Sequence, residues 1–224
     1  MFDDLVLVQK LLASVVVGYL LGAVPFAHVA ARLNGVDIFA TGSRRAGTAN
    51  VFWNVGRRVG TLVFVGDVAK GALAVLIAQL LDLPGFLVLP AGAAAVVGHW
   101  KSIFTGFRGG DGMATLMGVT LALVPVLALV GIGVGLLVVA LRWRSSMRSA
   151  WGIAACYAVL LAASQVYQTN REVVMGLAAL AVMVLGHNYV TRHAAIGPDE
   201  PPGLDLGPDD ESDAGLGPTA PQKR

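Results

Sequence analysis

Long apolar stretches separated by short polar segments run through most of the chain. A transmembrane helix needs roughly 20 mostly apolar residues, with about 17–25 as the usual range. The stretches that fit or approach this description are residues 5–31, 61–81, 86–98, 113–141, 150–166 and 173–185. The pattern predicts an all-α, polytopic integral membrane protein.

The apolar run 113–141 determines how many spans we expect, because it is too long for one ordinary span. Proline removes a backbone donor and clashes with the preceding helical turn. We therefore expect two spans with a break near Pro125. The chain then has about seven transmembrane helices.

The distribution of basic residues agrees with this topology, because cytoplasmic loops collect Lys and Arg. One side of the membrane receives Arg32, Arg44, Arg45, Arg57, Arg58, Lys101, Arg108, Arg142, Arg144, Arg148 and Arg192. The other side receives Lys10 and Arg171, together with Asp3, Asp4, Asp82 and Glu172. We therefore predict that the N-terminus lies outside, and that the C-terminus and the glycine-rich loops lie in the cytoplasm.

The amino-acid composition further limits the classes of protein and of site that we expect. Hydrophobic residues make up 56% of the chain and charged residues 13%, against about 45–50% and about 25% in soluble domains. A net charge of +2 gives no global electrostatic support for a nucleic-acid partner. The single cysteine, Cys156, excludes an internal disulfide framework and a CxxC site. The missing CxxC motif leaves no zinc or redox site of that kind.

The last residues differ in character from the rest. Residues 198–224 are rich in Pro, Gly, Asp and Glu and have almost no large apolar side chains. Such a segment cannot bury enough surface to offset the entropy lost on ordering. We predict a membrane domain over residues 1–197 and a disordered cytosolic tail over 198–224.

The polar segment 41–58 contains chemistry suited to a phosphate. Glycines such as Gly47 let the backbone approach a ligand closely, and successive N–H groups can form an anion-binding nest. Ser43 and Asn50 add neutral donors, while Arg44 and Arg45 add guanidinium groups suited to phosphate. The alternative is an ordinary positive-inside loop with turn residues.

The polar segment 98–115 has the same character. Its glycines 109, 110 and 112 precede an expected helix, and a helix N-terminus preceded by glycines is a ready anion site. Lys101 and Arg108 supply positive charge. The pattern G-x-x-x-x-G-K-[ST] is absent, so nucleotide hydrolysis has no support. The alternative is a tight turn between two spans.

Ionisable residues near the expected span ends complete the set of candidates. Asp67 and Lys70 lie three residues apart, on one helix face, and charged groups at membrane depth usually pair or face a polar cavity. We favour a structural ion pair, although Lys70 could also lend charge to a phosphate. His99 and His187 are candidates for acid–base work or phosphate binding, or are interfacial hydrogen-bond donors.

Taken in order, these residues form a recognisable series. The series is Gly42-Ser43, Gly47 and Asn50, Gly66-Asp67 with Lys70-Gly71, Gly98-His99, Phe107-Arg108-Gly109-Gly110, Gly112-Met113-Ala114-Thr115, and His187 with Gly197 and Asp199. Over roughly residues 5–199 the chain resembles the bacterial acyl-phosphate:glycerol-3-phosphate acyltransferases, the PlsY family of integral membrane enzymes.

The resemblance implies an activity in phospholipid synthesis. An acyl group would pass from a fatty acyl-phosphate to glycerol 3-phosphate, giving lysophosphatidate and inorganic phosphate without a metal. It also implies a cytosolic active site in a bacterial plasma membrane, contact with membrane lipid, and an acyl-phosphate-producing enzyme as a possible partner.

The resemblance also assigns the site. The catalytic candidates are Ser43, His99 and His187, with Ser43 more suited to cradling a phosphate than to acting as a covalent nucleophile. The substrate- and phosphate-binding candidates are Gly47, Asn50, Lys70, Lys101, Arg108, Gly109, Gly110 and Gly112.

The chain departs from the family pattern at five positions. Asp111 replaces a lysine, Arg45 and Val190 replace asparagines, and Trp53 and His193 replace arginines. These changes motivate an alternative, a non-catalytic member that binds lipid or phosphate ligands without turnover. They also suggest that Arg44 or Arg45, opposed to Asp111, restores the local charge balance. A small anion transporter has less support, because Asp67 and Lys70 stand almost alone within the spans.

Overall fold

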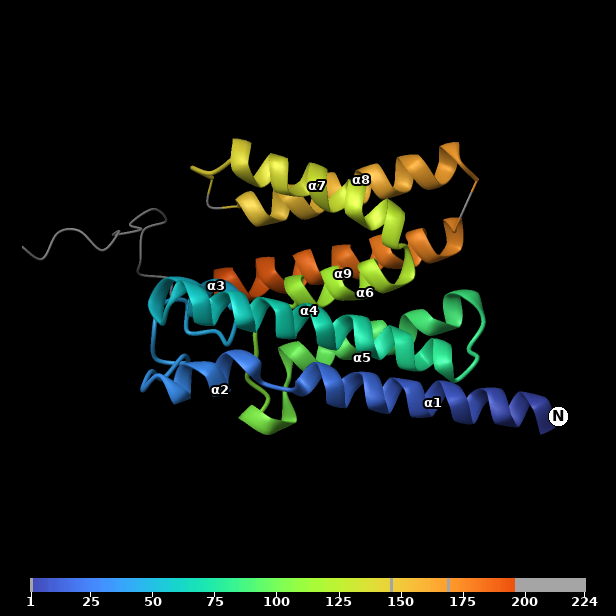
Figure 1. The fold of residues 1–224 in the computed structure, drawn as a ribbon, viewed down its shortest axis with the longest axis horizontal. Coiled ribbons are helices and arrows are strands. Elements are labelled where there is room, and N and C mark those ends of the chain that lie inside the picture. Colours follow the sequence, from blue (N-terminus) through green and yellow to red (C-terminus); the bar gives the residue numbers. More distant parts are fainter. Residues whose placement is uncertain (1, 146, 169, 196–224) are drawn as a thin grey trace, which may run out of the picture. The chain divides into compact units, whose positions relative to one another are not determined.

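The structure, a computed structural model, describes residues 2–145, 147–168 and 170–195 (Figure 1). Every regular element within these residues is a helix, which confirms the all-α prediction. The predicted tail 198–224, and Gly197 and Asp199 of the family pattern, lie outside the described residues. The predicted boundary between a membrane domain and a tail therefore stays a prediction.

The helices follow one another with short connections, except for the two longer loops 34–47 and 101–112. In chain order they are α1 (Phe2–Ala23), α2 (Phe26–Leu33), α3 (Thr48–Asn54), α4 (Arg57–Leu80), η1 (Gly85–Val88), α5 (Leu89–Trp100), η2 (Ile103–Thr105), α6 (Met113–Leu123), α7 (Pro125–Leu141), α8 (Arg148–Val166) and α9 (Arg171–Ala195).

Five helical segments are long and apolar enough to cross a membrane. They are Phe2–Leu33, Arg57–Leu80, Gly85–Thr105, Arg148–Val166 and Arg171–Thr191. The helices α6 and α7 are apolar but shorter. The chain is a multi-pass membrane protein, and the count of about seven spans stays a prediction that depends on α6 and α7.

Two prolines interrupt the apolar runs, and only one of the breaks was predicted. The expected break near Pro125 is present, since α6 ends at Leu123 and α7 begins at Pro125. The stretch 5–31, expected as one continuous helix, also breaks, because α1 ends at Ala23 and α2 begins at Phe26. Pro25 cannot donate a helical hydrogen bond, and this explains the break.

Small residues bring neighbouring helices close together. A Cβ atom at Gly22 of α1 would run into the carbonyl group of Ala95 on α5, and a Cβ atom at Gly118 of α6 would run into the carbonyl group of Val68 on α4. Glycine at such positions lets membrane helices approach backbone to backbone. The apolar core that these contacts enclose includes Val75, Leu116, Leu160, Leu177 and Val184.

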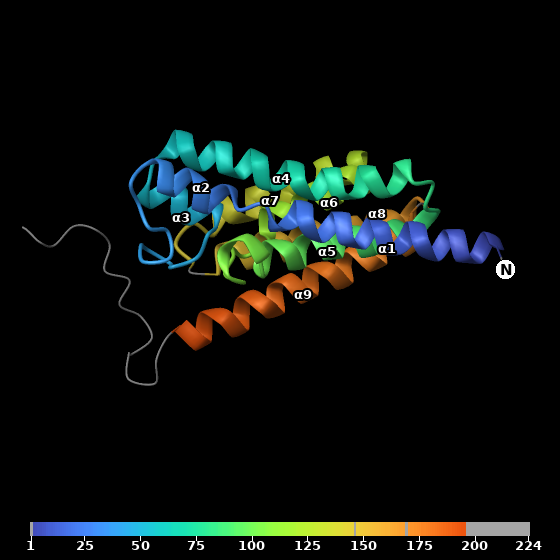
Figure 2. The same cartoon turned by 90° about the horizontal axis from the view of Figure 1, so that it is seen from below.

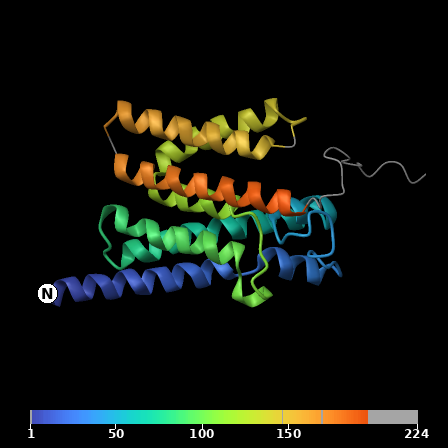
Figure 3. The same cartoon turned by 180° about the vertical axis from the view of Figure 1, so that it is seen from behind.

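Within residues 1–188, the connections between helices lie at the two opposite ends of the helices. Loop 34–47, loop 101–112 and the connection after α7 lie at one end, whereas the N-terminus and the turns after α4 and α8 lie at the other (Figures 1, 2 and 3). Apart from Arg192, which lies beyond residue 188, the basic residues expected on one side of a membrane belong to these connections or to the helix ends next to them, at one end of the helices. Both glycine-rich segments lie at this end.

Candidate functional site

The two glycine-rich loops touch each other. The backbone N–H of Ala46 in the first loop donates to the carbonyl oxygen of Gly109 in the second at 3.1 Å. The N–H of Gly110 donates to the carbonyl oxygen of His99, also at 3.1 Å. Two segments more than 60 residues apart in the chain thus form one surface at the end of α5.

Close packing of the second loop requires its glycines. A Cβ atom at Gly109 would run into the carbonyl oxygen of His99, and one at Gly110 would run into the imidazole of His99. Gly112 has a φ of +79°, in the left-handed region that glycine adopts without strain. Loop 109–112 therefore passes directly over His99 before it enters α6.

The side chain of Asn50 is engaged within the first loop. Its side chain is buried, and its amide nitrogen lies 3.2, 3.0 and 2.9 Å from the carbonyl oxygens of Ile38, Thr41 and Arg45. An asparagine amide has only two N–H donors, so these carbonyls occupy it. Its Oδ1 accepts a hydrogen bond from Asn54 at 2.9 Å. Asn50 holds the first loop together.

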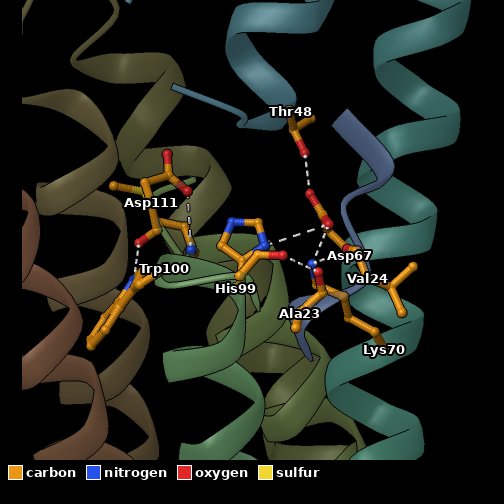
Figure 4. A network of polar contacts seen from close by, with 10 residues as sticks. Ala23, Val24, Thr48, Asp67, Lys70, His99, Trp100 and Asp111 are labelled. Carbon is orange, nitrogen blue, oxygen red and sulfur yellow. Dashed lines mark hydrogen bonds and ion pairs between the residues drawn. The ribbon is translucent and has the colours of Figure 1, made fainter. Parts of the chain in front are cut away.

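Three buried polar side chains form a cluster below the loops (Figure 4). Asp67, Lys70 and His99 are 1%, 3% and 5% exposed. Lys70 Nζ lies 2.9 Å from Asp67 Oδ1, and His99 Nδ1 lies 3.6 Å from the same oxygen. The ion pair expected from the i, i+3 spacing is present, and the structure adds a histidine from α5.

Two further contacts connect this cluster to its surroundings. Thr48, at the start of α3, donates from its hydroxyl to Asp67 Oδ2 at 3.4 Å. Lys70 Nζ donates to the carbonyl oxygen of Val24 at 3.1 Å, at the break between α1 and α2. Lys70 is thus engaged by Asp67 and Val24, which corresponds to the structural role.

His187 reaches the second loop through an aromatic neighbour. Its ring stacks on that of Trp100 with a centroid distance of 4.1 Å and an interplanar angle of 13°. Trp100 Nε1 donates to the carbonyl oxygen of Asp111 at 3.0 Å, and Asn188 Nδ2 donates to the same oxygen at 3.0 Å. Sequence reasoning missed Trp100 and Asn188, although both are neighbours of singled-out histidines.

Asp111, the acidic residue in the second loop, has a local structural task. Its Oδ1 accepts a hydrogen bond from the N–H of Met113 at 3.2 Å, at the first turn of α6. Its Oδ2 lies 4.0 Å from the place that a Cβ atom of Gly47 would occupy. The carboxylate therefore binds the first N–H group of α6 and also faces the first loop.

The remaining candidates lie toward solvent. Ser43, Lys101 and Arg108 are exposed, and the Arg108 guanidinium lies 4.2 Å above the ring of Phe39. Trp53, at a position that departs from the family pattern, is 64% exposed. Together the exposed residues give the loop surface positive charge next to neutral donors.

Two cavities adjoin the loops. A small one is lined by His99, Lys70, Asp67, Ser102, Arg108 and Gly109. A larger, mainly apolar cavity of about 280 Å³ lies among α4, α6, α7 and α8, with Met113, Met117, Ile132, Ile153 and Tyr157 in its lining. Its lining includes Met113, the residue that directly follows loop 101–112. Across the described ranges, no group of three or more His, Cys, Asp or Glu side chains is placed to hold a metal ion.

Comparison with known proteins gives consistent matches over most of the chain. Residues 12–195 match the family described as glycerol-3-phosphate acyltransferase. A glycerol-3-phosphate acyltransferase from Geotalea daltonii is 34% identical over 80% of this chain and 91% of its own length. One from a Roseiflexus species is 38% identical over 81% of this chain and 90% of its own length.

Solved structures agree with the sequence matches. The crystal structure of PlsY, an integral membrane glycerol 3-phosphate acyltransferase, in its glycerol 3-phosphate form has a TM-score of 0.68 and 32% identity. The match covers 83% of this chain and 92% of PlsY. The lysophosphatidic acid form gives a TM-score of 0.66 and 30% identity. On its sequence and its fold, this chain belongs to the glycerol-3-phosphate acyltransferase family of integral membrane proteins.

Proposed function

We propose that this protein transfers a fatty acyl group from an acyl-phosphate to glycerol 3-phosphate, giving lysophosphatidate and inorganic phosphate. The observation that carries the proposal is that two kinds of surface are neighbours along the chain at the start of α6. The joined glycine-rich loops, with Lys101 and Arg108, suit phosphate groups, and the apolar cavity that Met113 helps to line suits an acyl chain. Glycerol-3-phosphate acyltransferase activity is also the activity named for the relatives.

The reaction needs little chemistry from the protein. A hydroxyl oxygen of glycerol 3-phosphate attacks the acyl carbonyl carbon, a C–O ester bond forms, and the C–O bond to phosphate breaks. The hydroxyl proton ends on the released phosphate, so atoms and charges balance. Phosphate is a good leaving group, so positioning and fixed positive charge supply most of the catalysis.

We assign the exposed residues of the loop surface to the substrates. Lys101 and Arg108 provide charge for the phosphates, and the exposed Ser43 provides a neutral donor. His99 and His187 flank this surface and hydrogen-bond to the reacting groups. Asn50 and Lys70 act by holding the loops and the helices in place.

We further propose a plasma-membrane enzyme of a bacterium with this surface in the cytoplasm and the N-terminus outside. The gathering of basic residues at one end of the helices supports this orientation, because such residues stay in the cytoplasm. An acyl-phosphate is a reactive mixed anhydride, so an enzyme that produces it must act nearby.

The decisive experiment measures phosphate release from palmitoyl phosphate by the purified protein in detergent, with and without glycerol 3-phosphate. We expect release that depends on glycerol 3-phosphate and falls strongly in Ser43→Ala. Ser145→Ala, in the connection after α7, is the matched control and should retain activity. Binding of either substrate without turnover, in protein shown to be folded, would instead identify a non-catalytic family member.

A further inference from the structure

The buried cluster has a feature that the proposed reaction does not use. Asp67 and Lys70 are almost fully buried and are engaged with each other, so neither is presented to a substrate. Burying an ion pair costs desolvation energy that apolar residues of similar size would avoid. The presence of a buried ion pair next to the proposed binding surface therefore suggests that the pair has a role there.

The orientation of His99 supplies one. Its two ring nitrogens point in different directions, and one of them points toward Asp67 (Figure 4). Nδ1 faces the Asp67 carboxylate at 3.6 Å, whereas Nε2 faces the second loop at Gly110, where an added Cβ atom would run into it. The imidazole thus connects a buried negative charge to the loop surface.

A neutral imidazole carries one N–H, and its surroundings decide which nitrogen has it. A separation of 3.6 Å is too long for a hydrogen bond. The carboxylate charge still acts strongly over this distance in a buried site, and it favours a proton on the nitrogen that faces it. The opposite tautomer would point the Nδ1 lone pair at a negative charge.

We propose that Asp67 is a positioning residue that keeps the proton of His99 on Nδ1, so that Nε2 presents a lone pair to the glycine-rich loop. Lys70 and Thr48 hold the Asp67 carboxylate in position. Lys70 pairs with Oδ1 at 2.9 Å, and the Thr48 hydroxyl donates to Oδ2 at 3.4 Å. Their contacts come from α4 and from the start of α3, so the arrangement is held from two sides.

The tautomer determines what His99 contributes to the reaction, and this consequence rests on the proposed function. With Nε2 unprotonated, His99 accepts a hydrogen bond from the attacking glycerol hydroxyl and orients its oxygen. With Nε2 protonated, it would donate to a phosphate or to the nearby carbonyl oxygen of Ala46. The site therefore contains an acceptor for the hydroxyl next to donors for the phosphates.

The direct test reads the tautomer without any turnover. In the full chain labelled with ¹⁵N-histidine, the signals of the four histidines are recorded by NMR, and His99→Gln identifies those of His99. We expect His99 to carry its proton on Nδ1. We expect the double variant Asp67→Asn/Lys70→Met to shift the proton toward Nε2. A wild-type His99 protonated on Nε2 would overturn the proposal, whatever the activity of the protein.

The kinetic test separates positioning from stability. Asp67→Asn/Lys70→Met removes both charges, so the interior stays neutral, and we expect kcat to fall about 10- to 100-fold with the KM for glycerol 3-phosphate unchanged. In a His99→Gln background the same double change should cause no further loss, because both act through one group. Full additivity of the two losses, or wild-type kcat in the double variant, would contradict the proposal.

A matched control is available at the other end of the helices. Lys10 and Asp82 form an exposed pair with a separation of 3.4 Å. Lys10→Met/Asp82→Asn changes the same kinds of side chain and should leave kcat unchanged. Melting temperatures of all variants show whether each is folded. Failure of the acyl-transfer proposal leaves the NMR result to decide the role of Asp67.

Discussion

Two polar regions lie next to each other at the end of the helices that carries the glycine-rich loops, and they differ in whether their charged side chains are buried or exposed. In the buried cluster of Asp67, Lys70 and His99, each charge faces another part of the protein. On the loop surface, Lys101 and Arg108 are exposed. Buried charges are costly and are kept where they set geometry, whereas exposed charges remain available to a ligand. This difference supports our proposal that the first region positions other groups and the second binds phosphate.

Breaking the buried pair should have the largest effect on stability. Lys70→Met leaves the Asp67 carboxylate buried without its ion-pair partner, and we expect a loss of about 3–5 kcal/mol in the free energy of unfolding. Asp67→Asn/Lys70→Met should recover most of it. Lys10→Met, in the exposed pair, should cost less than about 1 kcal/mol. Denaturant unfolding in detergent measures all three, and equal losses in Lys70→Met and Lys10→Met would refute the distinction.

Adding a side chain at Gly110, where the second loop packs against His99 of the buried cluster, should have the largest effect on activity. Gly110→Ala places a methyl group against the His99 imidazole and displaces the loop, and we expect about a 100-fold loss of kcat/KM, because misplacement by about 1 Å can cost this much. Gly133→Ala on α7 is the control, since nothing lies within 4 Å of its added Cβ. Normal turnover by Gly110→Ala would mean that the loop position does not matter.

Removing an exposed cation should act mainly on substrate binding. We expect Arg108→Gln to raise the KM of a phosphate substrate about tenfold, because a charge-assisted hydrogen bond contributes about 1.5–3 kcal/mol. Arg144→Gln is the comparison, since Arg144 also lies over an aromatic ring, with its guanidinium 5.0 Å from that of Trp143. Initial rates over a range of both substrates distinguish the two. An identical KM in Arg108→Gln would exclude this residue from phosphate binding.

The smallest effect should come from the acidic residue in the second loop. Asp111→Asn keeps an oxygen that can accept from Met113 N–H but removes a negative charge beside the phosphate surface. We expect the KM of glycerol 3-phosphate to fall about two- to threefold with little change in stability. Asp82→Asn, at the other end of the helices, controls for the loss of a carboxylate. A rise in KM would show that Asp111 itself helps to hold a ligand.

Reading of the site from sequence succeeded where the signal was local. The Asp67–Lys70 pair was predicted from its i, i+3 spacing. Glycines 109, 110 and 112 were singled out because they lie together directly before an expected helix. The role of Asn50 could not be read in this way, because its partners Ile38, Thr41 and Arg45 depend on how loop 34–47 folds. The stacking of His187 on Trp100 joins residues 87 positions apart, and no spacing rule reports such a contact.

The two proline breaks illustrate the same limit within one class of signal. Pro125 lies in the middle of a run too long for one span, so length and proline chemistry point to the same break. Pro25 lies near the end of the run 5–31, which has 27 residues and can cross as one tilted span, so length alone gives no reason to divide it. The break matters because it exposes the Val24 carbonyl oxygen to Lys70.

The sequence by itself determined that the protein is a helical membrane protein, which family it resembles, and which polar loops carry residue types suited to phosphate. It could do so because the length of an apolar run, the position of a proline and the spacing of a motif are properties of residues near one another in the chain. Only the tertiary structure decided which of those residues are exposed on the loop surface and which are buried against other parts of the protein. Asp67 and His99 lie on different helices, and their meeting depends on how α4 and α5 pack. Side-chain roles of this kind arise from long-range packing, to which the order of residues along the chain is only an indirect guide.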